Sequence, residues 1–266
     1  MRGRVLIIAG SDSGGGAGIQ ADIKTVTALD GYAMTAIAAL TAQNTLGVHG
    51  VVAIDPEFVG LQIDVVLSDL GADAIKLGML ANAAIVAAVV ERLAPVANRI
   101  PIVLDPVMVA KGGHRLLEDA AIDLIRERLL PLATVVTPNA PEAEVLTGLP
   151  VTTPDEMLAA GAALRERGAR YALMKGGHLE GDRLVDRLIG PGLDVAYSDN
   201  RIDTPHTHGT GCTLASAVAT GLAQGLAVEA AVARARGYVR RAIETAPGYG
   251  SGHGPLNHAH PFERTR

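Results

Sequence analysis

Short apolar segments alternate with helical segments along most of this chain, and this order constrains the fold more than any other feature. The segments predicted as strands are Val5–Ala9, Met34–Leu40, Ala74–Leu77, Ile102–Leu104, Thr134–Val136 and Tyr171–Met174. The segments predicted as helices are Ala17–Leu29, Pro56–Leu67, Ala83–Leu93, Asp119–Leu130 and Pro154–Arg167. Short apolar runs are typical of buried parallel strands. The alternation therefore predicts an α/β fold with a single doubly wound, mostly parallel sheet and helices on both faces.

The C-terminal third departs from this alternation. Arg183–Ile189 and Val195–Tyr197 flank a Gly-Pro-Gly turn and are expected to form a hairpin. Two helices are expected over Cys212–Gln224 and Val228–Thr245, and the tail from Pro247, rich in Gly, Pro and His, is expected to be loose.

Composition limits the classes of function. The chain has 266 residues, is 48% hydrophobic and shows no break in composition, which favours one domain over residues 1–266. Its net charge of −5 is spread without a basic stripe, which argues against nucleic acid as a partner. No apolar run is long enough to cross a membrane, and the first one reads as a strand. A single cysteine forms no internal disulfide, so we expect a cytoplasmic protein.

The sequence His208-Gly-Thr-Gly-Cys212 is the strongest chemical signal. Its glycines let the backbone turn with its N–H groups outward, and the small residues that follow begin a predicted helix. Main-chain N–H groups and the positive end of the helix dipole then converge, which suits an anion. Cys212, the only cysteine, lies there, and a helix N-terminus lowers the pKa of a thiol. We interpret this segment as a site of phosphate transfer.

Other candidate site residues follow the predicted strands, at the sheet edge where doubly wound folds bind ligands. They are Gly10, Met79, Asp105, Asn139 and Lys175. Each has an ordinary structural explanation when taken alone. Lysine at a strand end is more often solvated than catalytic, for example. They gain weight because they share one edge.

The glycine-rich segment Gly10–Gly18 follows the first strand and opens a helix. Its glycine spacing resembles a dinucleotide-binding loop, but the acidic residue expected after the second strand is missing. A flexible turn explains the segment equally well. Asp22, one helical turn further on, could reach back over the loop or be an exposed helical charge.

Three further side chains carry plausible chemistry. Gln43 offers a donor and an acceptor that match an aminopyrimidine edge, although a polar loop would also contain it. Asp105 and Glu142 could hold Mg²⁺ through waters, as magnesium on phosphates is usually held. For Glu142 a first-turn helix charge is the simpler explanation.

Seven motifs in this order resemble the ribokinase-like kinases, and most closely the hydroxymethylpyrimidine/phosphomethylpyrimidine kinases of thiamin biosynthesis. They cover most of the chain: GSDSGGGAGIQAD (Gly10–Asp22), MTAIAALTAQNT (Met34–Thr45), KLGML (Lys76–Leu80), LDPVMVAKGG (Leu104–Gly113), VTPNAPEAE (Val136–Glu144), MKGGH (Met174–His178) and THGTGCT (Thr207–Thr213).

The resemblance implies ATP-dependent phosphorylation of 4-amino-5-hydroxymethyl-2-methylpyrimidine and then of its monophosphate, with Mg²⁺ as cofactor. It implies a set of roles for the residues of this sequence. The pyrimidine would contact Gln43, Asp22, Gly10, Met79 and Val107; ATP would contact Asn139, Lys175, Thr207 and Gly209; the metal would lie near Glu142 and Asp105; and catalysis would involve Cys212, Lys175, Gly209 and Gly211.

Several expectations stay open at this stage. Cys212 could accept the alcohol proton in the first step, or be only a small residue at a helix start. Lys111 and Arg115 could form a lid over the monophosphate, or a solvated loop; His114, Pro205 and His206 have no assigned role. The rival functions are a pyridoxal-type kinase and a non-catalytic pyrimidine-binding regulator. Relatives are commonly dimers, and the alanine-rich stretch Ala81–Ala94 could pack against a second copy.

Overall fold

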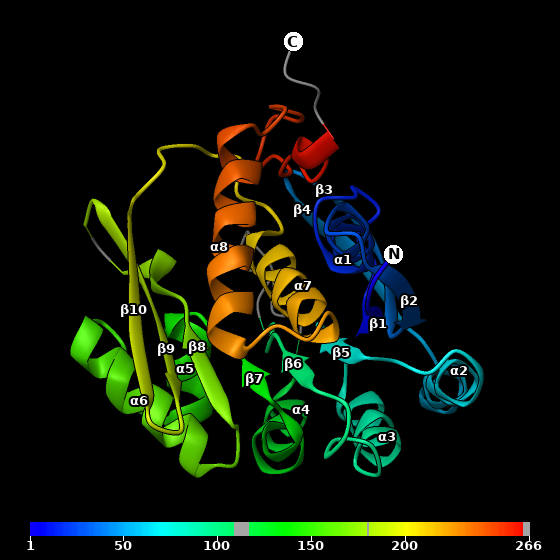
Figure 1. Cartoon of the computed structure of the whole chain (residues 1–266). Helices are drawn as coiled ribbons and strands as arrows, with labels where there is room; N and C mark the ends of the chain where they lie inside the picture. The colour runs from blue at the N-terminus through cyan, green and yellow to red at the C-terminus, as the bar shows by residue number, and fades with distance from the viewer. Residues whose placement is uncertain (109–116, 180, 263–266) are drawn as a thin grey trace.

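The computed structural model describes residues 1–108, 117–179 and 181–262 of the chain. A central sheet, in the order β10-β9-β8-β7-β6-β5-β1-β2, runs through the molecule (Figure 1). Its strands are β1 (Arg4–Ala9), β2 (Tyr32–Ile37), β5 (Ala74–Leu77), β6 (Ile102–Leu104), β7 (Val135–Val136), β8 (Tyr171–Met174), β9 (Arg183–Gly190) and β10 (Leu193–Asn200). The six strands from β8 to β2 are parallel, and β9 pairs antiparallel with both β8 and β10.

Helices cover both faces of this sheet. One face is covered by α1 (Gly18–Ala28), α7 (Thr210–Ala223) and α8 (Val228–Glu244), and Figure 1 shows α7 and α8 packed side by side in front of the strands. The other face carries α2 (Pro56–Asp69), α3 (Ala83–Leu93), α4 (Asp119–Leu124), α5 (Ala140–Thr147) and α6 (Pro154–Glu166). The predicted doubly wound architecture is confirmed.

The strand β1 shows why apolar runs form this sheet. Val5 and Ile7 belong to the core on the α1, α7 and α8 side, whereas Leu6 and Ile8 belong to the core on the opposite side. All four side chains are fully buried. A strand buried on both faces needs a continuous apolar run, and that is what the sequence supplies.

The strand order reverses at β1. The chain passes from β1 through α1 to β2 on one side, and later returns to β5 on the other side of β1. Parallel sheets of this kind bind ligands in the crevice beyond the carboxyl ends of such strands. The strand ends are nearly level there, because Ile8 pairs with Leu77, Leu77 with Leu104, and Leu104 with Val136.

The segment Met34–Leu40, predicted as one strand, is divided in the structure. Pairing with β1 stops at Ile37, opposite Ala9, where β1 ends. The chain then leaves the sheet as β3 (Ala39–Asn44), which pairs antiparallel with β4 (Gly47–Ala53) in a separate two-stranded sheet. The apolar pattern runs through this break and therefore does not reveal it.

The predicted helix Asp119–Leu130 is also irregular. The regular α4 ends at Leu124 and continues as a π-helical turn over Ile125–Leu129 and a 3-10 turn over Leu130–Leu132. Pro131 has no N–H to donate, which prevents a regular continuation. The short helix α5, which the sequence analysis did not list, begins beside Pro141.

The C-terminal tail is packed, so the expectation of a loose tail is wrong for residues 247–262. Leu256 and His258 are 4% and 5% exposed. The Tyr238 hydroxyl donates to the His258 carbonyl oxygen at 2.8 Å, and the His258 ring lies 3.0 Å from Thr213 Oγ1. Burial lowers the pKa of His258 to about 4, so its ring is neutral. Two buried side chains thus fix a segment whose composition suggested disorder. In the part of the chain that the structure describes, no helix is long and apolar enough to span a membrane.

Candidate active site

A cavity of about 1230 Å³ opens at the carboxyl ends of the parallel strands. It brings together nearly all of the residues singled out in the sequence. Its lining includes Gly10, Gln43, Met79, Asp105, Val107, Asn139, Glu142, Lys175, Thr207, Gly209, Gly211 and Cys212. Lys111, His114 and Arg115 lie outside the described residues.

The start of α7 forms one wall of the cavity. Gly209 is its N-cap with φ of +82°, and a side chain there would collide with the Gly16 carbonyl oxygen. First-turn amides of a helix have no partner within the helix, so those of Gly211 and Cys212 are suited to bind an anion at the cavity wall. The glycine at 209 is thus required by the local backbone, and it places the helix start against the glycine-rich loop.

A compact ionic cluster lies beside this helix start. Lys175 Nζ is 2.9 Å from Asp105 Oδ1 and 3.7 Å from Glu142 Oε2. Burial lowers the pKa of Lys175, but Asp105 and Glu142 outweigh burial and the net shift is upward. Burial raises the pKa of Glu142 to about 7, against the pull of Lys175. A β-carbon on Gly211 would lie 3.2 Å from Lys175 Nζ and 3.3 Å from Asp105 Oδ2. The lysine therefore carries its charge directly beside the amides of α7.

Asn139 and Glu142 also cap α5. The Asn139 side chain accepts a hydrogen bond from the Glu142 N–H at 2.9 Å, and the Glu142 carboxylate accepts one from the Asn139 N–H at 2.8 Å. This reciprocal capping box satisfies two amides of the first turn. The structural explanation for Glu142 is thus confirmed, and the same residue also lines the cavity.

The donor set suits a divalent cation only in part. No group of three or more His, Cys, Asp or Glu side chains that could hold a metal occurs among residues 1–108, 117–179 and 181–262. Asp105 and Glu142 nevertheless place two carboxylates on one lysine at the cavity wall. Mg²⁺ is usually bound by one or two carboxylates together with phosphates and waters. The residues present therefore fit a magnesium ion that arrives with a polyphosphate.

Asp22 does not line the cavity, contrary to the expectation that it contacts the pyrimidine. It is fully buried beneath the floor, where it accepts hydrogen bonds from Lys76 Nζ at 2.8 Å and Ser216 Oγ at 2.7 Å. Burial raises the pKa of Asp22, although Lys76 and Ser216 oppose this. Lys76, not assigned any role from the sequence, reaches the cavity lining instead. A charged residue within an otherwise apolar, buried strand was the feature of the sequence that could have identified Lys76 as a site residue.

Cys212 lies in the first turn of α7 and faces the cavity. Burial raises the pKa of its thiol to about 12, and the attraction of Lys76 does not overcome burial together with Asp22 and Asp105. The expectation of a lowered pKa at this helix start is therefore wrong. The helix dipole and Lys76 lower the pKa of the thiol, but desolvation and the two carboxylates raise it by more. The thiol therefore stays protonated at neutral pH.

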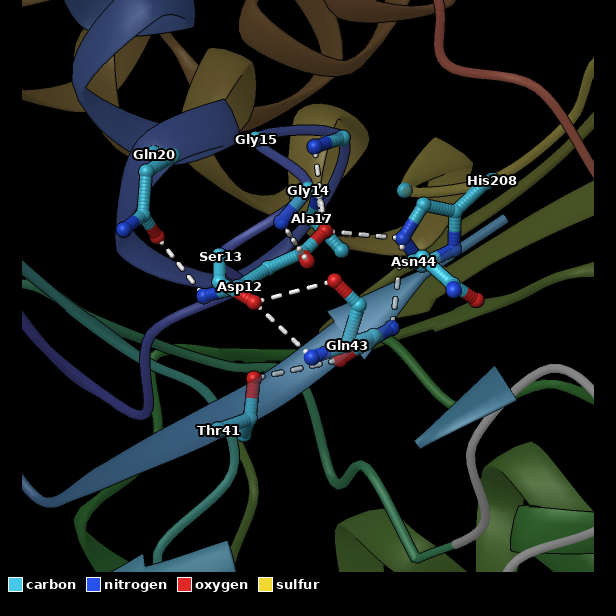
Figure 2. Close-up of polar contacts among 12 residues, drawn as sticks. Asp12, Ser13, Gly14, Gly15, Ala17, Gln20, Thr41, Gln43, Asn44 and His208 are labelled. Atoms are coloured by element: carbon cyan, nitrogen blue, oxygen red, sulfur yellow. Dashed lines mark hydrogen bonds and ion pairs between the residues drawn. The ribbon is translucent and has the colours of Figure 1, made fainter. Parts of the chain in front are cut away.

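Gln43 projects from β3 into a polar cluster that the sequence analysis missed (Figure 2). His208 Nε2 is 2.8 Å from Asp12 Oδ2 and 3.3 Å from the side-chain nitrogen assigned to Gln43. Asp12 also accepts hydrogen bonds from the backbone N–H groups of Gly14, Gly16 and Ala17. Two features of the sequence could have indicated this cluster: an aspartate inside the glycine-rich loop and a histidine directly before Gly209. The cluster joins three segments distant in sequence.

Comparison with known proteins identifies the family of the chain. A family model described as phosphomethylpyrimidine kinase matches residues 12–257. The hydroxymethylpyrimidine/phosphomethylpyrimidine kinase of Bacillus subtilis is 46% identical over 257 residues, covering 96% of this chain and 94% of that protein. The thiamine biosynthesis bifunctional protein ThiED of Geobacter sulfurreducens is 49% identical over 265 residues, covering 100% of this chain and 54% of that protein. The chain therefore spans about half the length of this bifunctional relative.

A solved structure shows the same fold. The pyridoxal kinase of Staphylococcus aureus in complex with pyridoxal matches with a TM-score of 0.90 at 34% identity, covering 100% of this chain and 96% of that one. Kinases for two different vitamin heterocycles thus resemble this chain over nearly its full length.

Proposed function

The chain belongs to the phosphomethylpyrimidine kinase family, and on this basis we propose that it phosphorylates 4-amino-5-hydroxymethyl-2-methylpyrimidine with ATP and then phosphorylates the monophosphate. One observation carries the proposal. The amides at the start of α7, the Lys175 cluster and the Gln43 side chain all line one cavity, so one cavity holds both an anion site and a heterocycle site. Phosphoryl transfer requires such positioning and charge neutralisation more than covalent chemistry.

The nucleotide side of the site is built from the α7 and α5 helix starts. Lys175 meets the nucleotide phosphates, and Gly209, Gly211 and Cys212 supply the amides around the transferring group. Asn139 and Thr207 line the same side of the cavity and contact ATP. Asp105 and Glu142 hold Mg²⁺, which neutralises phosphate charge when bound.

The pyrimidine side consists of an apolar surface and one amide. Gly10, Met79 and Val107 line the cavity and pack against the ring. The Gly10 N–H donates to the Met79 carbonyl oxygen at 3.0 Å, and a β-carbon on Gly10 would lie 2.5 Å from Met79 Cε, so a side chain there would displace the end of the Met79 side chain. Gln43 reads the amino and ring-nitrogen edge of the substrate.

The two chemical steps differ in their need for a base. In the first step the alcohol loses its proton as its oxygen attacks phosphorus, and Cys212 is the candidate acceptor. A thiol with a pKa of about 12 must first lose its own proton, so the role requires that bound substrates change its surroundings. In the second step the attacking phosphate oxygen is already ionised and no base is needed.

A steady-state assay with three phosphate acceptors tests the proposal. ATP-dependent phosphorylation is measured with the pyrimidine alcohol, its monophosphate and pyridoxal. We expect kcat/KM for both pyrimidines to exceed that for pyridoxal by at least about 10-fold, the effect of one well-placed hydrogen bond. Preference for pyridoxal would establish the rival function, a pyridoxal-type kinase; a pyridoxal kinase shares this fold at 34% identity. Binding of the pyrimidine without ATP turnover would indicate the regulator.

The proposal extends to assembly and location. Leu40 and Val52 are cross-strand partners in β3 and β4 and are 47% and 64% exposed, and this apolar pair suits a contact with a second copy in a homodimer. Phe58 and Leu61 on α2 are exposed as well. In the stretch Ala81–Ala94, α3 buries Ile85, Val89 and Leu93 in its own core, so a contact with a second copy would use its opposite, alanine-bearing face. Because ATP is the donor, we place the reaction in the cytoplasm.

A further inference from the structure

The side-chain amide of Gln43 lies between a histidine and a threonine in the polar cluster of Figure 2. An amide has two orientations that exchange its oxygen and nitrogen, and the choice between them follows from the hydrogen bonds around it. That choice decides which heterocycle edge Gln43 accepts. The cluster therefore bears on substrate selection as well as on local stability.

The Asp12 carboxylate fixes a proton on His208. Asp12 is 1% exposed, and its Oδ2 lies 2.8 Å from His208 Nε2. Burial acts to raise the pKa of Asp12, but hydrogen bonds from His208 and from backbone amides outweigh it and the net shift is downward. An ionised carboxylate only accepts hydrogen bonds. His208 Nε2 must therefore carry a hydrogen and act as the donor.

A protonated Nε2 then selects the orientation of Gln43. The amide atom 3.3 Å from His208 Nε2 is assigned as nitrogen, which would place two donors face to face. With the amide rotated, its oxygen faces the His208 Nε2–H, whose single hydrogen is donated mainly to Asp12 at 2.8 Å and is shared with Gln43 at 3.3 Å. The amide NH₂ then lies near Thr41 Oγ1, at the 3.5 Å position. The Thr41 hydroxyl already donates to the Ser11 carbonyl oxygen at 2.9 Å, so its lone pairs are available to the amide. In this arrangement no two donors lie face to face.

The backbone around His208 holds this ring in place. A β-carbon on Gly16 would lie 2.5 Å from His208 Cδ2, so the ring packs directly on the glycine-rich loop. The next residue, Gly209, packs on the Gly16 carbonyl. The His208 ring is consequently fixed between the glycine-rich loop and the start of α7, and it is 9% exposed.

From this geometry we infer that the Asp12–His208 pair positions the Gln43 amide with its oxygen toward His208 and its NH₂ toward Thr41, and so selects a ring with a donor beside an acceptor. The inference rests on the proposed function and adds a specificity-determining pair to it. A 4-aminopyrimidine places its exocyclic NH₂ on the Gln43 oxygen and its ring nitrogen on the Gln43 N–H. The 4-oxo analogue, which carries C=O beside a ring N–H, presents the reversed pattern and is rejected.

Calorimetric binding of the 4-amino alcohol and its 4-oxo analogue tests the selection. We expect the native chain to prefer the amino compound by about 100-fold or more, because the wrong compound leaves buried polar groups mismatched. His208→Phe keeps a ring on Gly16 but removes the donor, and should reduce this ratio by at least about 10-fold. His208→Gln restores an N–H donor and should recover part of the ratio.

Gln20→Leu is the matched control. Gln20 Oε1 accepts from the Asp12 N–H at 2.8 Å and steadies the same loop without touching Gln43. Loosening the loop in this way should change both affinities alike and leave the ratio intact. A ratio that is unchanged in His208→Phe, with both affinities lowered equally or not at all, would overturn the inference and leave His208 a structural residue.

Nuclear magnetic resonance of the substrate-free chain separates this inference from the proposed function. Long-range ¹H–¹⁵N spectra should show a hydrogen on His208 Nε2, and the Gln43 amide protons should show contacts to Thr41. A bare Nε2, or amide protons in contact with the His208 ring, would overturn the inference whatever the chain phosphorylates. Failure of the native chain to bind the amino alcohol would instead overturn the proposed function.

Discussion

At the residue scale, the same side-chain atoms at the sheet edge both stabilise the fold and line the proposed active site. Glu142 caps α5 through its carboxylate, and that carboxylate also faces Lys175. Lys76 neutralises Asp22 beneath the cavity and contributes positive charge to the cavity lining. Such double use explains why each residue taken alone has an ordinary structural explanation. Only their common location indicates chemistry.

Substitution of Cys212 by serine tests the base in the first step. If the thiol accepts the alcohol proton, Cys212→Ser should lower kcat for the alcohol by about 100-fold, the usual contribution of general-base catalysis. The monophosphate reaction needs no base and should lose less than about 10-fold by the same reasoning. Single-turnover rates with each substrate provide the measurement. Equal losses in both steps would exclude the role.

Replacement of Glu142 by glutamine tests its raised pKa through stability. A carboxyl group with a pKa near 7 when folded and about 4.5 when unfolded keeps its proton longer in the folded chain. Its contribution to stability is therefore fully present below pH 4.5 and declines as the pH rises to 7. The free energy of unfolding of the native chain minus that of Glu142→Gln should fall by roughly 3 kcal/mol between pH 4.5 and 8. Urea titrations at both pH values measure this, and a difference that grows with pH would refute it.

At the element scale, the start of α7 and the excursion of β3 shape the site. The start of α7 could be predicted from the sequence, because glycines followed by small residues indicate a turn that leads into a helix. The departure of β3 from the central sheet could not be predicted, because the apolar pattern of Met34–Leu40 continues past the point where β1 ends and the chain leaves the sheet. Periodicity reports which side chains are buried. It does not report which partner strand buries them, and so Gln43 was predicted at a strand end without its neighbours.

Two glycine substitutions distinguish the fold of α7 from its chemistry. Gly209→Ala forces a β-carbon into the Gly16 carbonyl at a positive φ, and should cost at least about 2 kcal/mol of stability. Gly211→Ala meets only Lys175 Nζ and Asp105 Oδ2, at 3.2 and 3.3 Å. It should preserve folding but lower kcat by about 10-fold or more by displacing the lysine. Thermal unfolding and kcat for both variants check this; full activity of Gly211→Ala would contradict it.

At the scale of the whole molecule, the mostly parallel sheet and the helices on both of its faces followed from the sequence. The order of the strands and the contacts between segments distant in sequence did not. The tail shows the reason. Leu256 and His258 are single side chains in a Gly- and Pro-rich segment, and only the folded surface of α7 and α8 gives them something to pack against. The pair Asp12 and His208 is 196 residues apart and was invisible for the same reason.

Deletion of the chain after Ala246 tests the packed tail. It removes the buried Leu256 and the hydrogen bonds to Thr213 and Tyr238, and should lower the free energy of unfolding by about 2–4 kcal/mol. Deletion of residues 263–266 alone is the control. Chemical denaturation of the two truncated chains decides the matter, and equal stability would show that the tail contributes nothing.

A crystal structure with a non-hydrolysable ATP analogue and the pyrimidine alcohol tests the central claim most directly. The account predicts a terminal phosphate within hydrogen-bond distance of the Gly211 and Cys212 amides and of Lys175, facing an alcohol whose ring edge lies on Gln43. A terminal phosphate bound away from the start of α7, or a ring that does not meet Gln43, would contradict it.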